Sequence, residues 1–256
     1  MEKLDERPEV KVFLSIARAI ENGVRIVRTS AEDKEFSFQN WVGDRIAESG
    51  LKVESRGRIT YPDFVLTQHA IGIEVKGLGF DGARKDFDCN SQMPLAEHHD
   101  RKMFYIFGRY PNRTTDKEIV VYDLVMCTAS FLNADSSYVH KNKNIKGFAS
   151  YGDIMIRDRK MYVCRTPFTL IDGTQRQVTL VLDDIGAATS KELSEVGQLT
   201  RVESSNLIVG YSFDLRNNKL DPQHIPNPNS GKQHRFRAYK GRTFSNQPVI
   251  LKDHEG

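Results

Sequence analysis

Two stretches near the start of the chain repeat apolar residues with the 3.6-residue period of an amphipathic helix. The apolar positions of residues 8–22 are Val12, Phe13, Ile16, Ala17 and Ile20, and those of residues 31–49 are Phe38, Val42 and Ile46. Gly23 and Gly50 follow these stretches, and glycine is typical of a helix C-terminus. The pattern therefore predicts two helices over these ranges.

After residue 50 the pattern changes to short alternating runs that are typical of strands. The runs are LKVES (51–55), YPDFVL (61–66) and IGIEVK (71–76), and they predict an antiparallel meander. A short helix is expected over residues 91–102, and the aromatic-rich run 103–110, MFYIFGRY, predicts a buried strand. EIVVYDLV predicts a further strand that turns helical towards Leu132.

The second half of the chain is rich in strand-like runs. They are DIMI, KMYVCR, FTLI, QVTLVL and LIVGYSF. A helix-like stretch over residues 190–202 interrupts them, and the prolines and asparagines of residues 217–231 predict a long surface loop.

Together these elements predict an α/β (α+β) fold with a mixed central sheet, flanking helices and a β-rich C-terminal half. We expect an N-terminal helical extension over residues 1–29, a core over residues 30–135 and a β-rich region over residues 136–256. The three regions are expected to pack as one compact unit.

Composition narrows the class of protein. The chain has 256 residues, of which 39% are hydrophobic and 28% charged, so it can bury a core of ordinary size. It has neither a run of about 18 apolar residues nor an apolar signal-peptide core, so we expect a cytoplasmic protein without a membrane partner. Cys89, Cys127 and Cys164 lack CxxC spacing and predict reduced thiols, not a disulfide framework or zinc site.

The net charge of +3 is uninformative by itself, but basic residues concentrate in the second half. Residues 232–242, KQHRFRAYKGR, contain no acid and interleave Phe236 and Tyr239 with cations. The candidate DNA-binding residues are Lys232, Arg235, Arg237, Lys240 and Arg242. A solvated basic strand edge is the alternative interpretation. Lys141, Lys143 and Lys146 form a similar but weaker patch.

Three charged residues on the predicted meander carry the candidate chemistry. Side chains alternate along a strand, so Glu74 and Lys76 share one face while their apolar neighbours pack on the other. Asp63 begins the neighbouring strand, and a hairpin would bring the three groups together. Two converging carboxylates repel each other unless a cation lies between them, and hard oxygen ligands suit Mg²⁺. The carbonyl of Val75 could add a further metal ligand.

The pair Pro62-Asp63 and the run Glu74-Val75-Lys76, with ten residues between the two acids, resemble the motif of the PD-(D/E)xK nuclease superfamily. The order of predicted elements is also similar to that family's core, which has a helix, three antiparallel strands, a helix and a further strand. The resemblance covers about a third of the chain and implies a restriction-endonuclease-like core. It implies that Asp63 and Glu74 bind metal and that Lys76 positions water or acts as general base. Glu35 is the nearest candidate for an additional acid. The alternative is an exposed hairpin with a surface salt bridge.

Weaker patterns point elsewhere. Residues 77–82 fit GxGxxG, but the strand before them carries Glu74 and Lys76 where a dinucleotide-binding strand would be apolar. These glycines are expected to let the backbone turn or approach DNA. The run His98-His99-Asp100 favours surface or phosphate contacts over a metal site. Residues 90–92, Asn-Ser-Gln, could contact phosphates or base edges, or cap a helix.

Within the superfamily the chain is most similar to type II restriction endonucleases. The resemblance implies a Mg²⁺-dependent, sequence-specific endonuclease for double-stranded DNA that acts as a homodimer, with residues 136–256 adding DNA contacts or dimerisation. Two alternatives stay open: a related nuclease of phage DNA processing, repair or recombination, and a non-catalytic DNA-binding protein. The chain has no Walker A motif, so no nucleotide cofactor is expected.

Overall fold

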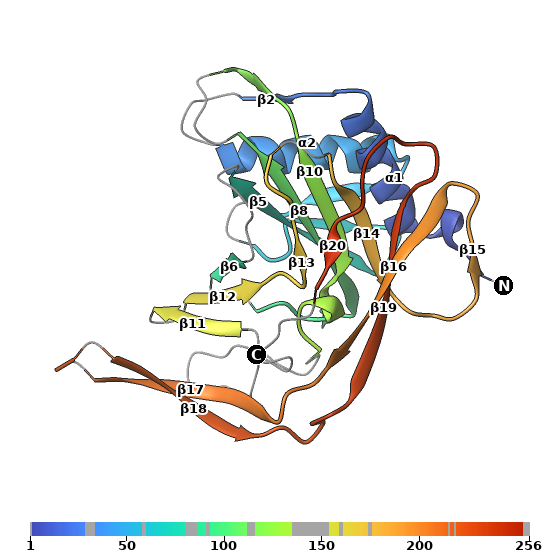
Figure 1. Cartoon of the computed structure of the whole chain (residues 1–256). Coiled ribbons are helices and arrows are strands. Elements are labelled where there is room, and N and C mark those ends of the chain that lie inside the picture. Colours follow the sequence, from blue (N-terminus) through green and yellow to red (C-terminus); the bar gives the residue numbers. More distant parts are fainter. Residues whose placement is uncertain are drawn as a thin grey trace.

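A nine-stranded mixed sheet organises the part of the chain that the computed structural model describes (Figure 1). Eight strands follow the order β16-β19-β14-β10-β8-β5-β4-β3, and β7 pairs with β8 beside this path. Their bounds are β3 Val53–Ser55, β4 Phe64–Leu66, β5 Ile71–Gly79, β7 Glu97–His98, β8 Arg101–Tyr110, β10 Asp123–Thr128, β14 Val178–Asp183, β16 Leu193–Val202 and β19 Gln233–Gly241. The described residues are 2–28, 34–57, 60–79, 86–90, 93–111, 116–134, 154–158, 161–173, 176–214, 216–217 and 219–252.

The predicted meander is confirmed. β3 pairs antiparallel with β4, and β4 pairs antiparallel with β5 in a register that sets Phe64 opposite Ile73. β5 then runs parallel to β8 along nine residue pairs, from Ile71 with Lys102 to Gly79 with Tyr110. β8 is buried from Met103 onward, as its aromatic-rich sequence predicts.

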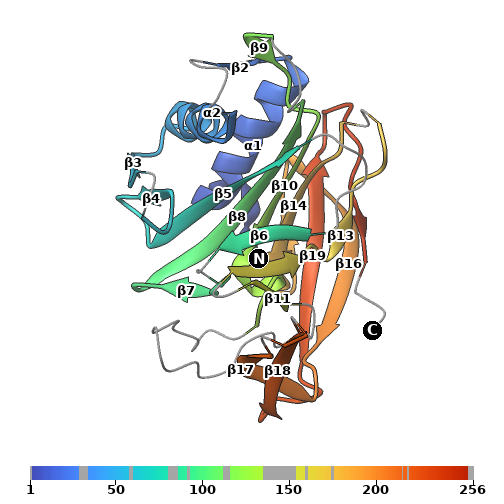
Figure 2. The same ribbon diagram turned by 90° about the vertical axis from the view of Figure 1, so that its left-hand side faces the viewer.

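Two α-helices cover one face of this sheet (Figures 1 and 2). α1 spans Pro8–Glu21 and α2 spans Lys34–Glu48, which confirms both predicted helices, although residues 31–33 lie outside the described residues. Their apolar stripes share one core with the alternate residues of β5 and β8, among them Ile73, Val75 and Phe104. With 14 and 15 residues, both described helices fall short of the roughly 20 apolar residues that cross a bilayer.

A second core lies on the opposite face. It contains Met103, Tyr105 and Phe107 of β8 and is covered by smaller elements. These are the sheet β11 (Ile154–Asp158), β12 (Met161–Arg165) and β6 (Asp86–Asn90), the pair β13 (Phe168–Thr169) and β20 (Ile250–Leu251), and the 3₁₀-helix η2 (Ala129–Phe131). The described residues thus form an α+β fold whose two α-helices lie on one face of the sheet, not on both.

Short pairs complete the periphery. They are β1 (Glu2–Lys3) with β15 (Ala188–Thr189), β2 (Ile26–Val27) with β9 (Glu118–Ile119), and β17 (Asn206–Asp214) with β18 (Lys219–Pro226); the 3₁₀-helix η1 spans Leu4–Glu6. The strand-like runs of the second half are confirmed in β11, β12, β13, β14 and β17.

Three predicted elements are wrong. The helix expected over residues 91–102 is replaced, in its described part, by β7 and the start of β8, joined by a turn in which His99 and Asp100 adopt positive φ. The helix expected over residues 190–202 is β16, because its partly alternating sequence pairs with β19. The loop expected over residues 217–231 contains β18. Prolines fit there because each strand of a two-stranded ribbon has one edge without ladder hydrogen bonds.

Candidate active site

The structure brings the three charged residues of the motif together at the β4–β5 hairpin. Because Phe64 pairs with Ile73, Asp63 just before β4 lies opposite Glu74 on β5. Ile73 and Val75 pack in the core beneath the helices, so Glu74 and Lys76 point to the opposite face, as the alternation predicts. The predicted convergence of one strand start with the middle of its neighbour is therefore observed.

Hydrogen bonds link the two carboxylates through the backbone. The Val75 N–H donates to Asp63 Oδ2 at 2.8 Å, and the Asp63 N–H donates to Glu74 Oε2 at 3.3 Å. The Lys76 ammonium lies 2.8 Å from Glu74 Oε1. The side chains of Glu74 and Lys76 are only 12% and 15% exposed, so both charges lose most of their contact with water, and their mutual attraction offsets part of that cost. The Glu74–Lys76 ion pair is therefore largely buried and is not a fully exposed surface salt bridge.

Gln39 is a fourth member of the site that sequence reasoning missed. This buried residue of α2 donates from Nε2 to Asp63 Oδ1 at 3.0 Å. Each oxygen of Asp63 therefore accepts at least one hydrogen bond, which fixes the carboxylate plane. The signal in the sequence is an amide directly after Phe38 of the apolar stripe. Glu35 belongs to the same helix, but its side chain lies outside the described residues.

Two glycines allow α2 to pack close to the sheet, which brings Gln39 within hydrogen-bonding distance of Asp63. A Cβ atom on Gly108 of β8 would lie 2.0 Å from the ring of Phe38, and one on Gly43 of α2 would lie 3.0 Å from the ring of Phe64. Both distances are shorter than ordinary carbon contacts. Close helix–sheet packing at these glycines thus supports the hydrogen bond that orients Asp63.

The donor set fits Mg²⁺. Two carboxylates on adjacent strands provide hard oxygen atoms, and an ionised carboxylate can accept several hydrogen bonds or metal contacts. Within the described ranges, no group of three or more His, Cys, Asp or Glu side chains could hold a metal. Mg²⁺ usually takes one or two carboxylates and completes its shell with water and substrate phosphates, so two suffice. The N–H of Val75 points towards Asp63, and in a strand the carbonyl of the same residue points to that side too.

Aromatic side chains flank the hairpin. The Tyr61 ring packs edge-on against His98 with centroids 4.9 Å apart, and its hydroxyl lies 3.3 Å from that of Tyr105. Burial, together with the charges of His99 and Arg56, lowers the pKa of His98. The imidazole is therefore neutral at pH 7, which argues against His98 as a cationic phosphate contact.

The cations of the predicted DNA-binding segment, residues 232–242, do not converge at one point as the three charged residues of the hairpin do. Arg237 contacts Asp184 at 2.7 Å and Glu195 at 3.0 Å, and its guanidinium holds the pKa of Asp184 below its usual value. Lys240 and Arg242 donate to backbone carbonyls. Lys232 and Arg235 are exposed. Three strands separate β19 from β5, a span of about 19 Å at the usual strand spacing.

The aromatic residues of that segment correct the prediction. Phe236 and Tyr239 are 2% and 7% exposed and belong to the two cores, so neither can stack on a base in this conformation. The cause is that both faces of β19 are covered: the two rings are three residues apart, so they point to opposite faces of the sheet, and each packs in one of the two cores.

The backbone turn expected at the glycines of the GxGxxG pattern is not observed at Gly77 and Gly79. Both belong to β5, which continues straight through them beside β8, so the backbone does not turn there. The remaining glycine of GxGxxG lies outside the described residues, as do the side chains of residues 90–92 and the patch Lys141, Lys143 and Lys146. Cys127 and Cys164 are buried free thiols, which agrees with the expected reduced state; the Cys89 side chain is not described.

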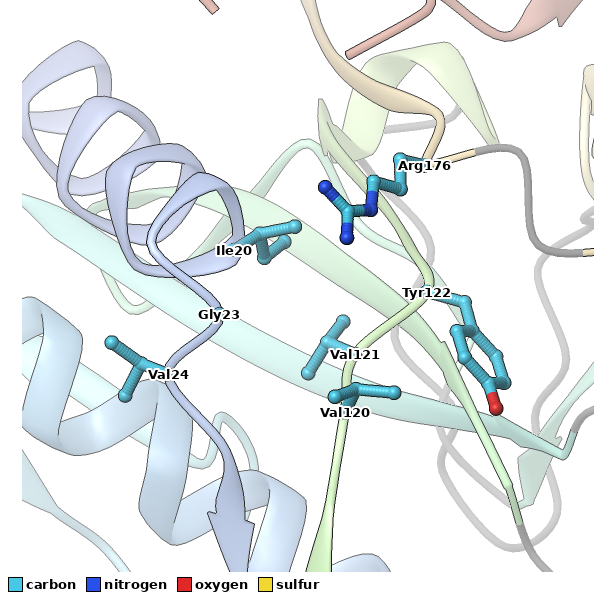
Figure 3. A pocket seen from close by; sticks show the side chains of 7 residues that line it. All are labelled: Ile20, Gly23, Val24, Val120, Val121, Tyr122 and Arg176. Carbon is cyan, nitrogen blue, oxygen red and sulfur yellow. The ribbon is translucent and has the colours of Figure 1, made fainter. Parts of the chain in front are cut away.

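A pocket of about 150 Å³ lies elsewhere, at the C-terminal end of α1 (Figure 3). Its lining residues are Ile20, Gly23, Val24, Val120, Val121, Tyr122 and Arg176. None of them is an acid, so this pocket offers no carboxylate to a metal ion, unlike the β4–β5 hairpin.

Comparison of the chain with protein-family models, curated proteins and solved structures found no match.

Proposed function

We propose that the protein is a Mg²⁺-dependent endonuclease that hydrolyses phosphodiester bonds of double-stranded DNA. The observation that carries the proposal is the convergence of Asp63, Glu74 and Lys76 across two adjacent strands. This combination of two carboxylates and an amine is suited to hydrolysis at phosphorus, where negative charge builds up on oxygen.

Each residue has a role that its position supports. Asp63 and Glu74, with the Val75 carbonyl, would hold Mg²⁺, which supplies Lewis-acid stabilisation and lowers the pKa of water. Gln39 and the Val75 N–H keep the Asp63 carboxylate in one orientation. Lys76 lies beside Glu74, where its ammonium can orient the attacking water and offset charge on the phosphate.

The order of elements also supports the proposal. α2, the meander β3–β4–β5 and the further strand β8 follow one another as in the PD-(D/E)xK core that the motif resembles. The chain departs from that order between β5 and β8, where β7 and a tight turn stand in place of the end of the expected helix. Sequence-specific, type II cleavage by a homodimer rests on the resemblance alone.

The test is digestion of long unmethylated duplex DNA with Mg²⁺ and with chelator. Asp63→Asn and Glu74→Gln remove one charge each at nearly constant volume, and Asp44→Asn on the exposed side of α2 is the matched control. We expect discrete bands from the wild type and the control, and none from the site variants or with chelator. A smear would favour the repair or phage nuclease. Intact DNA, bound equally with and without chelator, would indicate a binding protein and refute the proposal.

A further inference from the structure

A two-stranded ribbon projects from the body of the protein and has no role in the site described above. β17 and β18 pair antiparallel from Asn206 with Pro226 to Asp214 with Lys219, and within the described chain neither pairs with another strand. Nine residues of β17 extend about 30 Å at the usual rise per residue. Figure 1 shows the ribbon running beyond the β11–β12 strands, and Figure 2 shows it at the bottom of the view, below β6 and β11.

The base of the ribbon is firmly held. Leu207, the second residue of β17, is buried, with 8% of its surface exposed. The buried Glu203 carboxylate accepts a hydrogen bond from Asn227 Nδ2 at 3.1 Å and lies 2.7 Å from His234 Nε2. Since Glu203 follows β16 and Asn227 leads back to β19, this network fixes both ends of the ribbon to the edge of the main sheet. The direction in which the ribbon projects is therefore built into the fold.

The described side chains near the far end of the ribbon are polar and include both charges: Arg216 and Lys219 are basic, and Asp221 is acidic and exposed. Arg216, Asn217 and Lys219 are exposed, and the Lys219 N–H donates to Asn217 Oδ1 at 3.0 Å. Arginine and lysine bind the O6 and N7 acceptors of guanine, and asparagine binds the N6 and N7 atoms of adenine.

From this geometry we infer that the tip of the ribbon enters the major groove of the DNA duplex and reads base edges with Arg216 and Asn217. The inference rests on the proposed function and assigns part of its sequence recognition. The major groove is about 12 Å wide and admits a two-stranded ribbon, and it distinguishes all four base pairs, whereas the minor groove presents a degenerate pattern. An isolated two-stranded ribbon is only marginally stable in water, so contact with a duplex would also stabilise it.

The experiment compares the wild type with the double variant Arg216→Ala/Asn217→Ala. The matched control is Arg25→Ala/Asn22→Ala, which removes the same exposed residue types next to β2, far from the ribbon in Figure 1. Cleavage with Mg²⁺ and binding to duplex DNA with chelator are both measured, and sedimentation reports the oligomeric state. We expect the ribbon variant to cut preferred sites roughly 10- to 100-fold more slowly, with near-normal affinity for random duplex.

The outcomes separate the two proposals. Unchanged cutting sites and rates in the ribbon variant would overturn the ribbon assignment and leave the nuclease intact. A loss of dimer that accompanies lost cleavage would instead assign the ribbon to contacts between copies and overturn the DNA assignment. If the wild type binds but never cuts, the nuclease proposal fails, and the ribbon assignment is then decided by binding: affinity for a selected duplex must fall in the ribbon variant and not in the control.

Discussion

The β4–β5 hairpin and the strand β19 are both rich in charge, yet they use it differently. On the hairpin, Asp63, Glu74 and Lys76 converge and contact one another at one partly buried point. On β19, the cations are spread along the strand. Arg237 forms ion pairs with Asp184, which directly follows β14, and with Glu195 of β16. The first arrangement concentrates charge at one point of the sheet, and the second distributes charge among contacts between neighbouring strands.

The difference shows why a spaced motif carries more information than local charge density. The motif specifies residues on two adjacent strands, so the sheet register converts its spacing directly into proximity. A run of cations within one strand specifies no partner. Its contacts depend on which acids the fold places opposite, and the run itself does not contain that information.

Substitution of one lysine and one arginine should separate the two regions most clearly. Lys76→Met removes the ammonium beside Glu74 while keeping the length of the side chain, and we expect roughly 10²- to 10³-fold slower single-turnover cleavage. Arg237→Met leaves Asp184 and Glu195 without their partner but should change the cleavage rate by less than about threefold, because β19 is remote from the site. Equal losses in both variants would show that β19 belongs to the active centre.

Substitution of Gln39 tests whether its hydrogen bond is needed to orient the Asp63 carboxylate. Gln39→Ala removes the hydrogen bond to Asp63 Oδ1, and loss of such an orienting contact typically costs roughly 10- to 100-fold in metal affinity or activity. We expect a higher Mg²⁺ concentration for half-maximal cleavage and an unchanged melting temperature within a few degrees. Asn40→Ala, an exposed amide on the same helix, is the control. A rate unaffected at every Mg²⁺ concentration would remove Gln39 from the site.

Local pattern was sufficient for much of the fold around the site. The periodic patterns of apolar residues predict α1, α2, β3, β4, β5 and β8, and the face shared by Glu74 and Lys76 follows from strand alternation. The contact from Gln39 could not be predicted, because it depends on how closely α2 approaches the sheet at Gly108 and Gly43. β16 could not be predicted either. Its pairing with β19 comes from a strand more than thirty residues later, and tertiary pairing overrode a helix-like composition.

The smallest effect concerns the two exposed cations of the basic segment, Lys232 and Arg235. If they contact phosphates, the variant Lys232→Ala/Arg235→Ala should lower the slope of log affinity against log salt by about 2, because each contact releases close to one counterion. Arg237→Ala should leave the slope unchanged, since Asp184 and Glu195 already neutralise that guanidinium. The measurement is anisotropy of a labelled duplex, with chelator present, over a salt series. An unchanged slope in the double variant would make β19 a structural strand throughout and leave DNA contact to other surfaces. A lower slope in Arg237→Ala would mean that DNA displaces the two acids, and the contrast between β19 and the β4–β5 hairpin would then hold only for the free protein.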